Sequence, residues 1–125
     1  QQFADNLEQH YEATVKRFFA LQFMGTRQDP AYLNALRDSI LKHPAKLAAL
    51  HQGLEMLRAL DFSNQIIKQP SLWMLGRLDK LVPVAVENDL KRLGYRCEVM
   101  AHASHVPFVT HTEAFMAIVE PFLHE

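Results

Sequence analysis

Apolar residues in the first half of the chain recur at the spacing of amphipathic helices, whereas the second half alternates helical spacing with short continuous apolar runs. From residue 3 to about residue 60 we expect three helices. In the first helix, one stripe at helical spacing consists of Leu7, Tyr11, Val15, Phe18 and Gln22, and Phe19 and Phe23 widen it. Gly25-Thr26 ends this helix, because glycine tolerates the left-handed conformation at a helix C-terminus.

The two following helices have clear starting or ending signals. Asp29-Pro30 begins one of them, since aspartate caps free backbone amides and proline fits the first helical position. This helix ends before Pro44. The next one contains Gly53 in its interior, which weakens it by about 1 kcal/mol relative to alanine. The apolar stripes are Leu33, Leu36, Ile40 and Leu41 in the former helix, and Leu47, Leu50, Leu54 and Leu57 in the latter.

From about residue 66 the pattern predicts strand, turn, helix, strand and helix. Leu72–Leu75 is a short apolar run, typical of a strand buried on both faces, and residues 95–100 suit a second strand. Strands that alternate with helices predict an α/β fold with a parallel sheet. Because two strands make no stable parallel sheet by themselves, we expect the remaining strands to lie outside this chain.

The connections in this half are also predicted. Residues 76–83 form a loop, residues 84–93 a helix closed by Gly94, and residues 101–111 a histidine-rich loop. A capping box of Thr110 and Glu113 is expected to begin the last helix. The side chains expected to be buried by that helix are Phe115, Ile118, Val119 and Phe122.

Composition narrows the function classes. The 125 residues carry 13 basic and 14 acidic side chains, a balance that argues against a general nucleic-acid binder. No apolar run approaches the roughly 18 residues of a membrane-spanning helix. The single cysteine, Cys97, excludes an intrachain disulfide and favours a reducing, cytoplasmic location. The first residue is Gln1 rather than methionine, which suggests a cut inside a longer protein.

Two loops contain the residues that could carry chemistry. Asp79 follows the first predicted strand and His105 follows the second. Because functional groups gather at the carboxyl ends of parallel strands, these two side chains can meet. Such an aspartate would orient the imidazole while the histidine serves as general base. Alternatively, Asp79 caps the following turn and His105 is an ordinary polar residue with its hydrogen bonds satisfied.

The same loops resemble the triad loops of the α/β-hydrolase family. One matches the family's G-x-x-D-x-x-V-P loop and reads Gly76-Arg77-Leu78-Asp79-Lys80-Leu81-Val82-Pro83. The other resembles the terminal H-x-P-F-x-x-H-P-x-x-F segment and reads Ser104-His105-Val106-Pro107-Phe108, followed by His111-Thr112-Glu113-Ala114-Phe115. The resemblance implies a partial α/β-hydrolase fold, with a helical lid at residues 1–65 and the last two parallel strands and helices of the core at residues 66–125. It also implies that Asp79 is the triad acid and His105 the triad histidine.

The helical half resembles the lid of one branch of this family. Residues 14–26 and 53–57 are similar to lid segments of the carboxylesterases of biotin synthesis that hydrolyse the methyl ester of pimeloyl-acyl carrier protein. The resemblance implies a serine esterase that needs no metal or redox cofactor and whose partner is the acyl carrier protein bearing the pimeloyl methyl ester.

The family's nucleophile is absent from this sequence. That nucleophile lies in a G-x-S-x-G elbow, and none of the four serines (Ser39, Ser63, Ser71 and Ser104) has glycines at the required positions. Cys97 lies inside a predicted strand, where it is expected to be a small buried residue. We therefore expect no ester hydrolysis by this chain alone. Its partner would be the missing N-terminal half of the hydrolase or a second copy of the chain.

The helical half also contains candidate binding residues. Four bulky apolar side chains either pack between helices or line a channel for an acyl chain, namely Phe18, Phe19, Phe23 and Met24. The resemblance implies that arginines of the lid hold the acidic carrier and its phosphopantetheine phosphate, for which the candidates are Arg17, Arg27 and Arg37. A solvated helix surface is the alternative for each of them. Trp73 is expected in the sheet core, or else at an acyl pocket.

The sequence alone leaves other functions open. His102, His105 and His111 match no common zinc spacing, so no metal site is predicted. The chain could belong to a general α/β-hydrolase esterase of another substrate. It could also be a non-catalytic helical module that binds an acyl carrier or self-associates. A binding module has no need of an aspartate and a histidine at strand ends, so the geometry of Asp79 and His105 distinguishes these alternatives.

Overall fold

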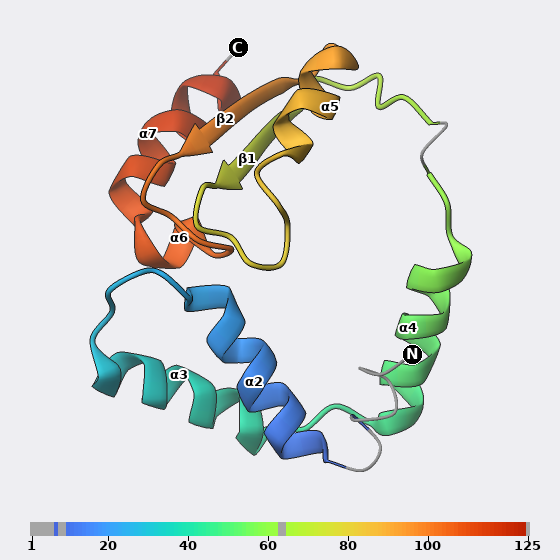
Figure 1. The fold of residues 1–125 in the computed structure, drawn as a ribbon, viewed down its shortest axis with the longest axis vertical. Helices are drawn as coiled ribbons and strands as arrows, with labels where there is room; N and C mark the ends of the chain where they lie inside the picture. Colours follow the sequence, from blue (N-terminus) through green and yellow to red (C-terminus); the bar gives the residue numbers. More distant parts are fainter. Residues whose placement is uncertain (1–6, 8–9, 63–64, 125) are drawn as a thin grey trace. The chain divides into compact units, whose positions relative to one another are not determined.

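A computed structural model describes Leu7, residues 10–62 and residues 65–124. The elements in chain order are the helices α2 (Tyr11–Phe23), α3 (Pro30–Lys42) and α4 (Leu47–Ala59), then β1 (Leu72–Gly76), α5 (Val86–Arg92), β2 (Arg96–Met100), α6 (Pro107–Thr110) and α7 (Thr112–Leu123) (Figure 1). They fall into two compact units, residues 1–19 with 29–67 and residues 20–28 with 68–125. The predicted beginning of the first helix at residues 3–6, 8 and 9 lies outside the described residues.

The first unit contains α3, α4 and the larger part of α2, which are the helices predicted from the sequence. The Asp29 side chain accepts a hydrogen bond from the Ala31 amide (3.0 Å), and Pro30 occupies the first turn of α3. The Tyr11 hydroxyl accepts a hydrogen bond from the Ala45 amide (3.1 Å), which ties α2 to the α3–α4 connection. Neither α3 nor α4 contains a buried residue. Their leucine stripes are therefore half-buried or exposed rather than enclosed.

The apolar face of α2 differs from the predicted stripe. Phe19 and Phe23 are buried, whereas Phe18 is 40% exposed. The sequence placed Phe18 on the central stripe and the other two at its margin. Since Phe19 and Phe23 are four positions apart, these two lie on one face of the helix, and that face is the buried one. α2 ends at Gly25, whose φ of 90° is the left-handed conformation expected there.

The second unit is built around a parallel pair of strands, which confirms the predicted sheet direction. β1 pairs with β2 in a register that runs from Leu72 opposite Arg96 to Gly76 opposite Met100. α5 and α7 lie on the two faces of this pair (Figure 1). The Arg96 guanidinium lies 5.9 Å from the centre of the Phe122 ring of α7.

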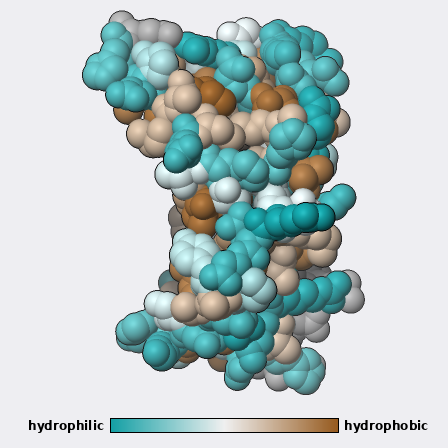
Figure 2. Space-filling model, turned by 90° about the vertical axis from the view of Figure 1, so that its left-hand side faces the viewer, coloured by the Kyte–Doolittle hydropathy of each residue, from teal (hydrophilic) through white to brown (hydrophobic). Residues whose placement is uncertain are grey.

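Burial in the second unit is shallower than the sequence suggested. Only Leu75 and Gly76 of β1 are buried, and the other three residues of the strand are half-buried. α7 contains no buried residue, so the four apolar side chains expected to be buried there are only half-buried. Figure 2 shows hydrophobic surface lying between hydrophilic side chains on one face of the molecule. Within the described residues, no helix has the length and apolar character needed to traverse a lipid bilayer.

The histidine-rich loop contains a helical turn that the sequence analysis did not predict. α6 spans four residues, too few for a hydrophobic period to be recognised. The predicted capping box is wrong: the Thr110 hydroxyl hydrogen-bonds to the Val106 carbonyl (3.2 Å) and to His111 Nδ1 (2.8 Å). α7 instead begins at Thr112 without a side-chain cap. Phe108 and Phe115 pack edge-to-face at 6.0 Å and join α6 to α7.

Gly76 is the point where the loop after β2 crosses the end of β1. The Leu78 amide donates to the Ala103 carbonyl (2.9 Å), and the Arg77 amide donates to the Met100 carbonyl (3.0 Å). A Cβ atom on Gly76 would lie 2.1 Å from the Ser104 carbonyl oxygen and 2.6 Å from that of Ala103. Since both obstacles are backbone atoms, no side-chain rotation relieves the clash. Glycine at this position lets the two loops touch.

Gly76→Ala and Gly53→Ala should therefore have opposite effects. Gly76→Ala forces backbone apart and should destabilise the second unit by several kcal/mol, in the range of severe steric changes. A Cβ on Gly53 meets nothing within 4 Å, so Gly53→Ala should stabilise α4 by about 0.5–1 kcal/mol. Thermal unfolding followed by circular dichroism measures both. Equal stability of the two variants would contradict the crossing described here.

Candidate active site

Asp79 is held in place by its own loop. One carboxylate oxygen, Oδ1, accepts hydrogen bonds from the Leu81 amide (2.7 Å) and the Val82 amide (3.0 Å). Only 6% of the side chain is exposed. Aspartate favours such a turn because its short side chain reaches backbone amides two and three residues ahead. The turn-capping role considered from the sequence is therefore real, and it fixes the direction of the carboxylate.

The second oxygen of Asp79 reaches the histidine. Asp79 Oδ2 lies 2.8 Å from His105 Nδ1. The two residues follow strands that are paired in register and end at the same level, which is why residues 26 positions apart come together. The expected approach of Asp79 to His105 within hydrogen-bonding distance is confirmed. Turn capping and histidine pairing are not alternatives here, since each uses a different carboxylate oxygen.

The protonation of the pair follows from its hydrogen bonds. Burial raises the pKa of the Asp79 carboxyl, but hydrogen bonds from the Val82 amide, His105 and the Leu81 amide outweigh burial and hold that pKa below its usual range. The carboxylate is thus ionised at neutral pH and can only accept hydrogen bonds. His105 Nδ1 must therefore be the donor to Oδ2, and Nε2 is the ring nitrogen that stays available for another partner. One third of the histidine side chain is exposed.

The backbone around His105 is fixed by the end of α2. The Gln22 carbonyl accepts hydrogen bonds from the Ser104 hydroxyl (2.6 Å) and from the His105 amide (3.2 Å). Ser104 is completely buried. The sequence offered Ser104 only as a candidate nucleophile and Gln22 only as a position on a helical stripe. The available signal was indirect: a serine directly before the histidine, and Gly25, a helix-ending residue, three positions after Gln22.

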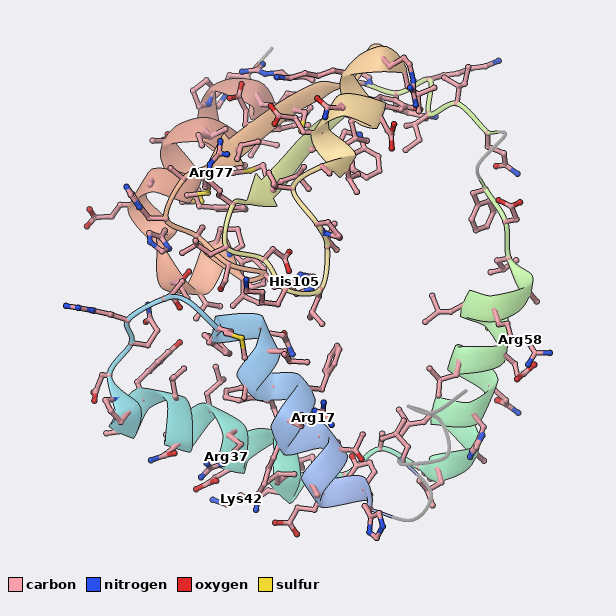
Figure 3. All side chains as sticks on the ribbon, viewed as in Figure 1. Arg17, Arg37, Lys42, Arg58, Arg77 and His105 are labelled. Atoms are coloured by element: carbon pink, nitrogen blue, oxygen red, sulfur yellow. The ribbon has the colours of Figure 1, made fainter. Side chains whose placement is uncertain are left out.

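The predicted binding residues lie on both units. In the first unit Phe19 is buried, Phe18 and Arg17 are exposed, and Arg37 pairs with Asp38 at 3.0 Å. In the second unit Phe23 is buried, whereas Met24 and Arg27 are exposed. Figure 3 labels His105 in the loop after β2, and Arg17 and Arg37 on α2 and α3. A role of these seven side chains in binding an acyl chain or a carrier stays a prediction.

Other reactive groups of the described chain are not poised for catalysis. The Ser104 hydroxyl is buried and donates to a carbonyl, so it is not a nucleophile. Cys97 lies in β2, and burial together with the nearby Glu87 and Glu98 carboxylates raises the pKa of its thiol. A raised pKa disfavours the reactive thiolate. Among residues 10–62 and 65–124, no group of three or more ligating side chains is placed to hold a metal ion.

The helices and the two parallel strands form part of an α/β-hydrolase fold, as predicted. The chain superposes on an esterase (EaEST) from Exiguobacterium antarcticum with a TM-score of 0.84, covering 99% of this chain and 47% of that one at 19% sequence identity. In sequence it is similar to pimeloyl-[acyl-carrier protein] methyl ester esterases, 41% identical to that of Shewanella sp. (strain MR-7) and 38% identical to that of Pseudoalteromonas atlantica.

These relatives are longer than the chain. The similarities cover 97% and 93% of this chain, but in each case 47% of the relative. The chain therefore spans about half the length of the curated relatives it matches. No family model matches it. The resemblance inferred from the two loops and the helical segments is confirmed by these relatives.

The Asp79 carboxylate should make the stability of the chain depend on pH. Because its pKa is lower in the folded chain than in the unfolded chain, the stabilisation is fully present above about pH 4, the usual value of an unfolded aspartate, and is lost as the pH falls through the lower folded-state pKa. The free energy of unfolding of wild type should thus exceed that of Asp79→Asn at neutral pH, and the gap should narrow in acid. A gap of equal size across this range would contradict the assignment.

Proposed function

We propose that the chain is the lid and the C-terminal part of the core of a serine carboxylesterase that hydrolyses the methyl ester of pimeloyl-acyl carrier protein. The products would be methanol and the free acid, which biotin synthesis uses. In this proposal residues 1–65 form the lid and residues 66–125 the core portion. The observation that carries the proposal is the 2.8 Å contact between Asp79 and His105 after two paired parallel strands. The names of the relatives support the choice of substrate.

The Asp–His geometry suits the roles of a triad acid and base. A serine supplied by the rest of the longer protein would attack the ester carbonyl while His105 Nε2 takes its proton. Asp79 would stabilise the resulting imidazolium through Oδ2, while Oδ1 stays bonded to the loop amides. His105 would then return the proton to the methoxide leaving group. Water would hydrolyse the acyl-enzyme in a second round through the same imidazole.

Completion of the site would come from outside this chain. The part described here contains neither a nucleophile elbow nor the loop that would donate amides to an oxyanion. Its sheet consists of β1 and β2 alone, so strands of the N-terminal half or of a second copy could pair with the remaining edge of β1. The proposal therefore assigns catalysis to the longer protein and the acid and base to this chain.

The first test compares the 125-residue chain with the longer protein. The isolated chain should show no p-nitrophenyl ester hydrolysis above an imidazole-like background, and it should elute larger than a monomer because of the open strand edge. The longer protein should release methanol from pimeloyl-acyl carrier protein methyl ester, as measured by mass spectrometry of the carrier. Asp79→Asn in that protein should lower turnover by about 10⁴, following the serine-protease precedent.

Two results would contradict the proposal. Serine-reagent-sensitive hydrolysis by the verified 125-residue chain would mean that the chain contains its own nucleophile. Hydrolysis of small esters by the longer protein without hydrolysis of the carrier-bound ester would favour a general esterase of another substrate.

The basic side chains of the first unit supply a second test. Arg17 is exposed on α2, and we propose that it attracts the acidic carrier. Arg17→Glu in the longer protein should lower kcat/KM for the carrier-bound ester about tenfold at low salt, and this loss should shrink at high salt. The loss for a short soluble ester should be much smaller.

Arg58→Glu is the matched control. Arg58 is an exposed arginine on α4, and it lies well apart from Arg17, Arg37 and Lys42 (Figure 3). The same charge reversal there should leave discrimination between the two esters unchanged. Equal losses for both arginine variants would point to net charge rather than to a docking surface.

A further inference from the structure

The turn that ends α2 touches both loops of the candidate site. On the histidine loop, the Gln22 carbonyl accepts from the Ser104 hydroxyl and the His105 amide, at 2.6 and 3.2 Å. On the aspartate loop, a Cβ atom on Gly25 would lie 3.3 Å from Leu78 Cβ. These contacts all belong to one compact unit. The end of this helix therefore contacts both loops that carry the Asp–His pair, in addition to the hydrogen bonds between the strands.

The chemistry of a helix end explains why this contact forms. The last four carbonyls of a helix have no partner within it, and they carry the negative end of the helix dipole. Gln22 is the penultimate residue of α2, so its carbonyl is one of these groups. Ser104 in turn is completely buried, where an unpaired hydroxyl would be costly. The Ser104 hydroxyl therefore supplies a donor to the Gln22 carbonyl, and the carbonyl supplies an acceptor to the buried hydroxyl.

Ser104 has little freedom to move. Its carbonyl oxygen lies against Gly76, where a Cβ atom would approach to 2.1 Å, and the neighbouring Ala103 is also completely buried. The backbone is thus confined on one side by the end of β1, while the hydroxyl is tied to α2 on the other. The residue that follows directly is His105. Three hydrogen bonds therefore set the position of His105. The Ser104 hydroxyl and the His105 amide both donate to the Gln22 carbonyl, and His105 Nδ1 bonds to Asp79.

We propose that Ser104 is a positioning residue whose hydrogen bond to the Gln22 carbonyl holds the His105 backbone where Nδ1 meets Asp79. Ser104 does not touch the reacting atoms and acts only through His105. The proposal rests on the proposed function for its catalytic consequence, but the positioning itself can be measured without catalysis. A serine suits this role because its hydroxyl is small enough for a fully buried place and can donate.

The direct test is proton NMR of the 125-residue chain. A histidine Nδ1 proton bonded to a carboxylate resonates at low field, and His105→Gln identifies the signal by removing it. Ser104→Ala should broaden or shift this signal upfield, because the imidazole no longer stays aligned with Asp79. Cysteine is similar in size to serine but a weaker donor, so the low-field signal of Ser104→Cys should be intermediate between those of wild type and Ser104→Ala. An unchanged signal in Ser104→Ala would overturn the proposal.

Thr110→Val is the matched control. The Thr110 hydroxyl also bonds to a backbone carbonyl of the same loop, that of Val106 at 3.2 Å, but it does not reach His105. This variant should leave the low-field signal in place. If it abolished the signal to the same extent, general loosening of the loop would account for both variants, and the specific role of Ser104 would be refuted.

Kinetics of the longer protein give an independent measurement. Ser104→Ala should lower kcat for a small soluble ester about tenfold, with KM little changed, as expected when one hydrogen bond that aligns the base is lost. A rise in KM with unchanged kcat would overturn the positioning role. If the longer protein hydrolyses no ester at all while the NMR signal responds as expected, the proposed function fails and the positioning of His105 by Ser104 stands.

Discussion

The geometry of the site depends on the Asp79 carboxylate, whose two oxygens accept hydrogen bonds from different partners. Asp79 gives Oδ1 to two amides of its own loop and Oδ2 to His105, so the same group shapes the loop after β1 and orients the imidazole after β2. The two amides fix the direction of the carboxylate through Oδ1, and this leaves Oδ2 aimed at His105. The parallel register of β1 and β2 makes this possible, because it brings both loops to one level.

Much of this arrangement could be predicted from the sequence. Helical spacing, Asp29-Pro30 and Gly25 located the helices of the first half, and the apolar run at residues 72–75 located β1. The rule that functional groups gather at the carboxyl ends of parallel strands indicated that Asp79 and His105 can meet, and the resemblance of their loops to triad loops implied that they do. These features follow from local signals repeated over many residues or from a general property of parallel sheets.

The features that the sequence did not reveal depend on single contacts in three dimensions. α6 is too short to show a period, and Thr110 bonds within its own turn, to Val106 and His111, instead of capping α7. Phe19 is buried in α2 and Phe18 is exposed, because only part of the wide apolar surface of this helix packs against other residues. Gln22 could not be identified as part of the site, because its contribution is a backbone carbonyl and every residue has one.

The contact of the Gln22 carbonyl with the histidine loop also limits which sequence changes the protein can tolerate during evolution. Because α2 presents a main-chain oxygen, almost any residue at position 22 would preserve the bond to the histidine loop, provided that the helix ends at the same place. An insertion or deletion upstream that moved the end of the helix by one residue would rotate a different carbonyl into position and break the contact. The side chains of this helix can therefore diverge, whereas the position of its end remains constrained by the contact with the loop that contains His105.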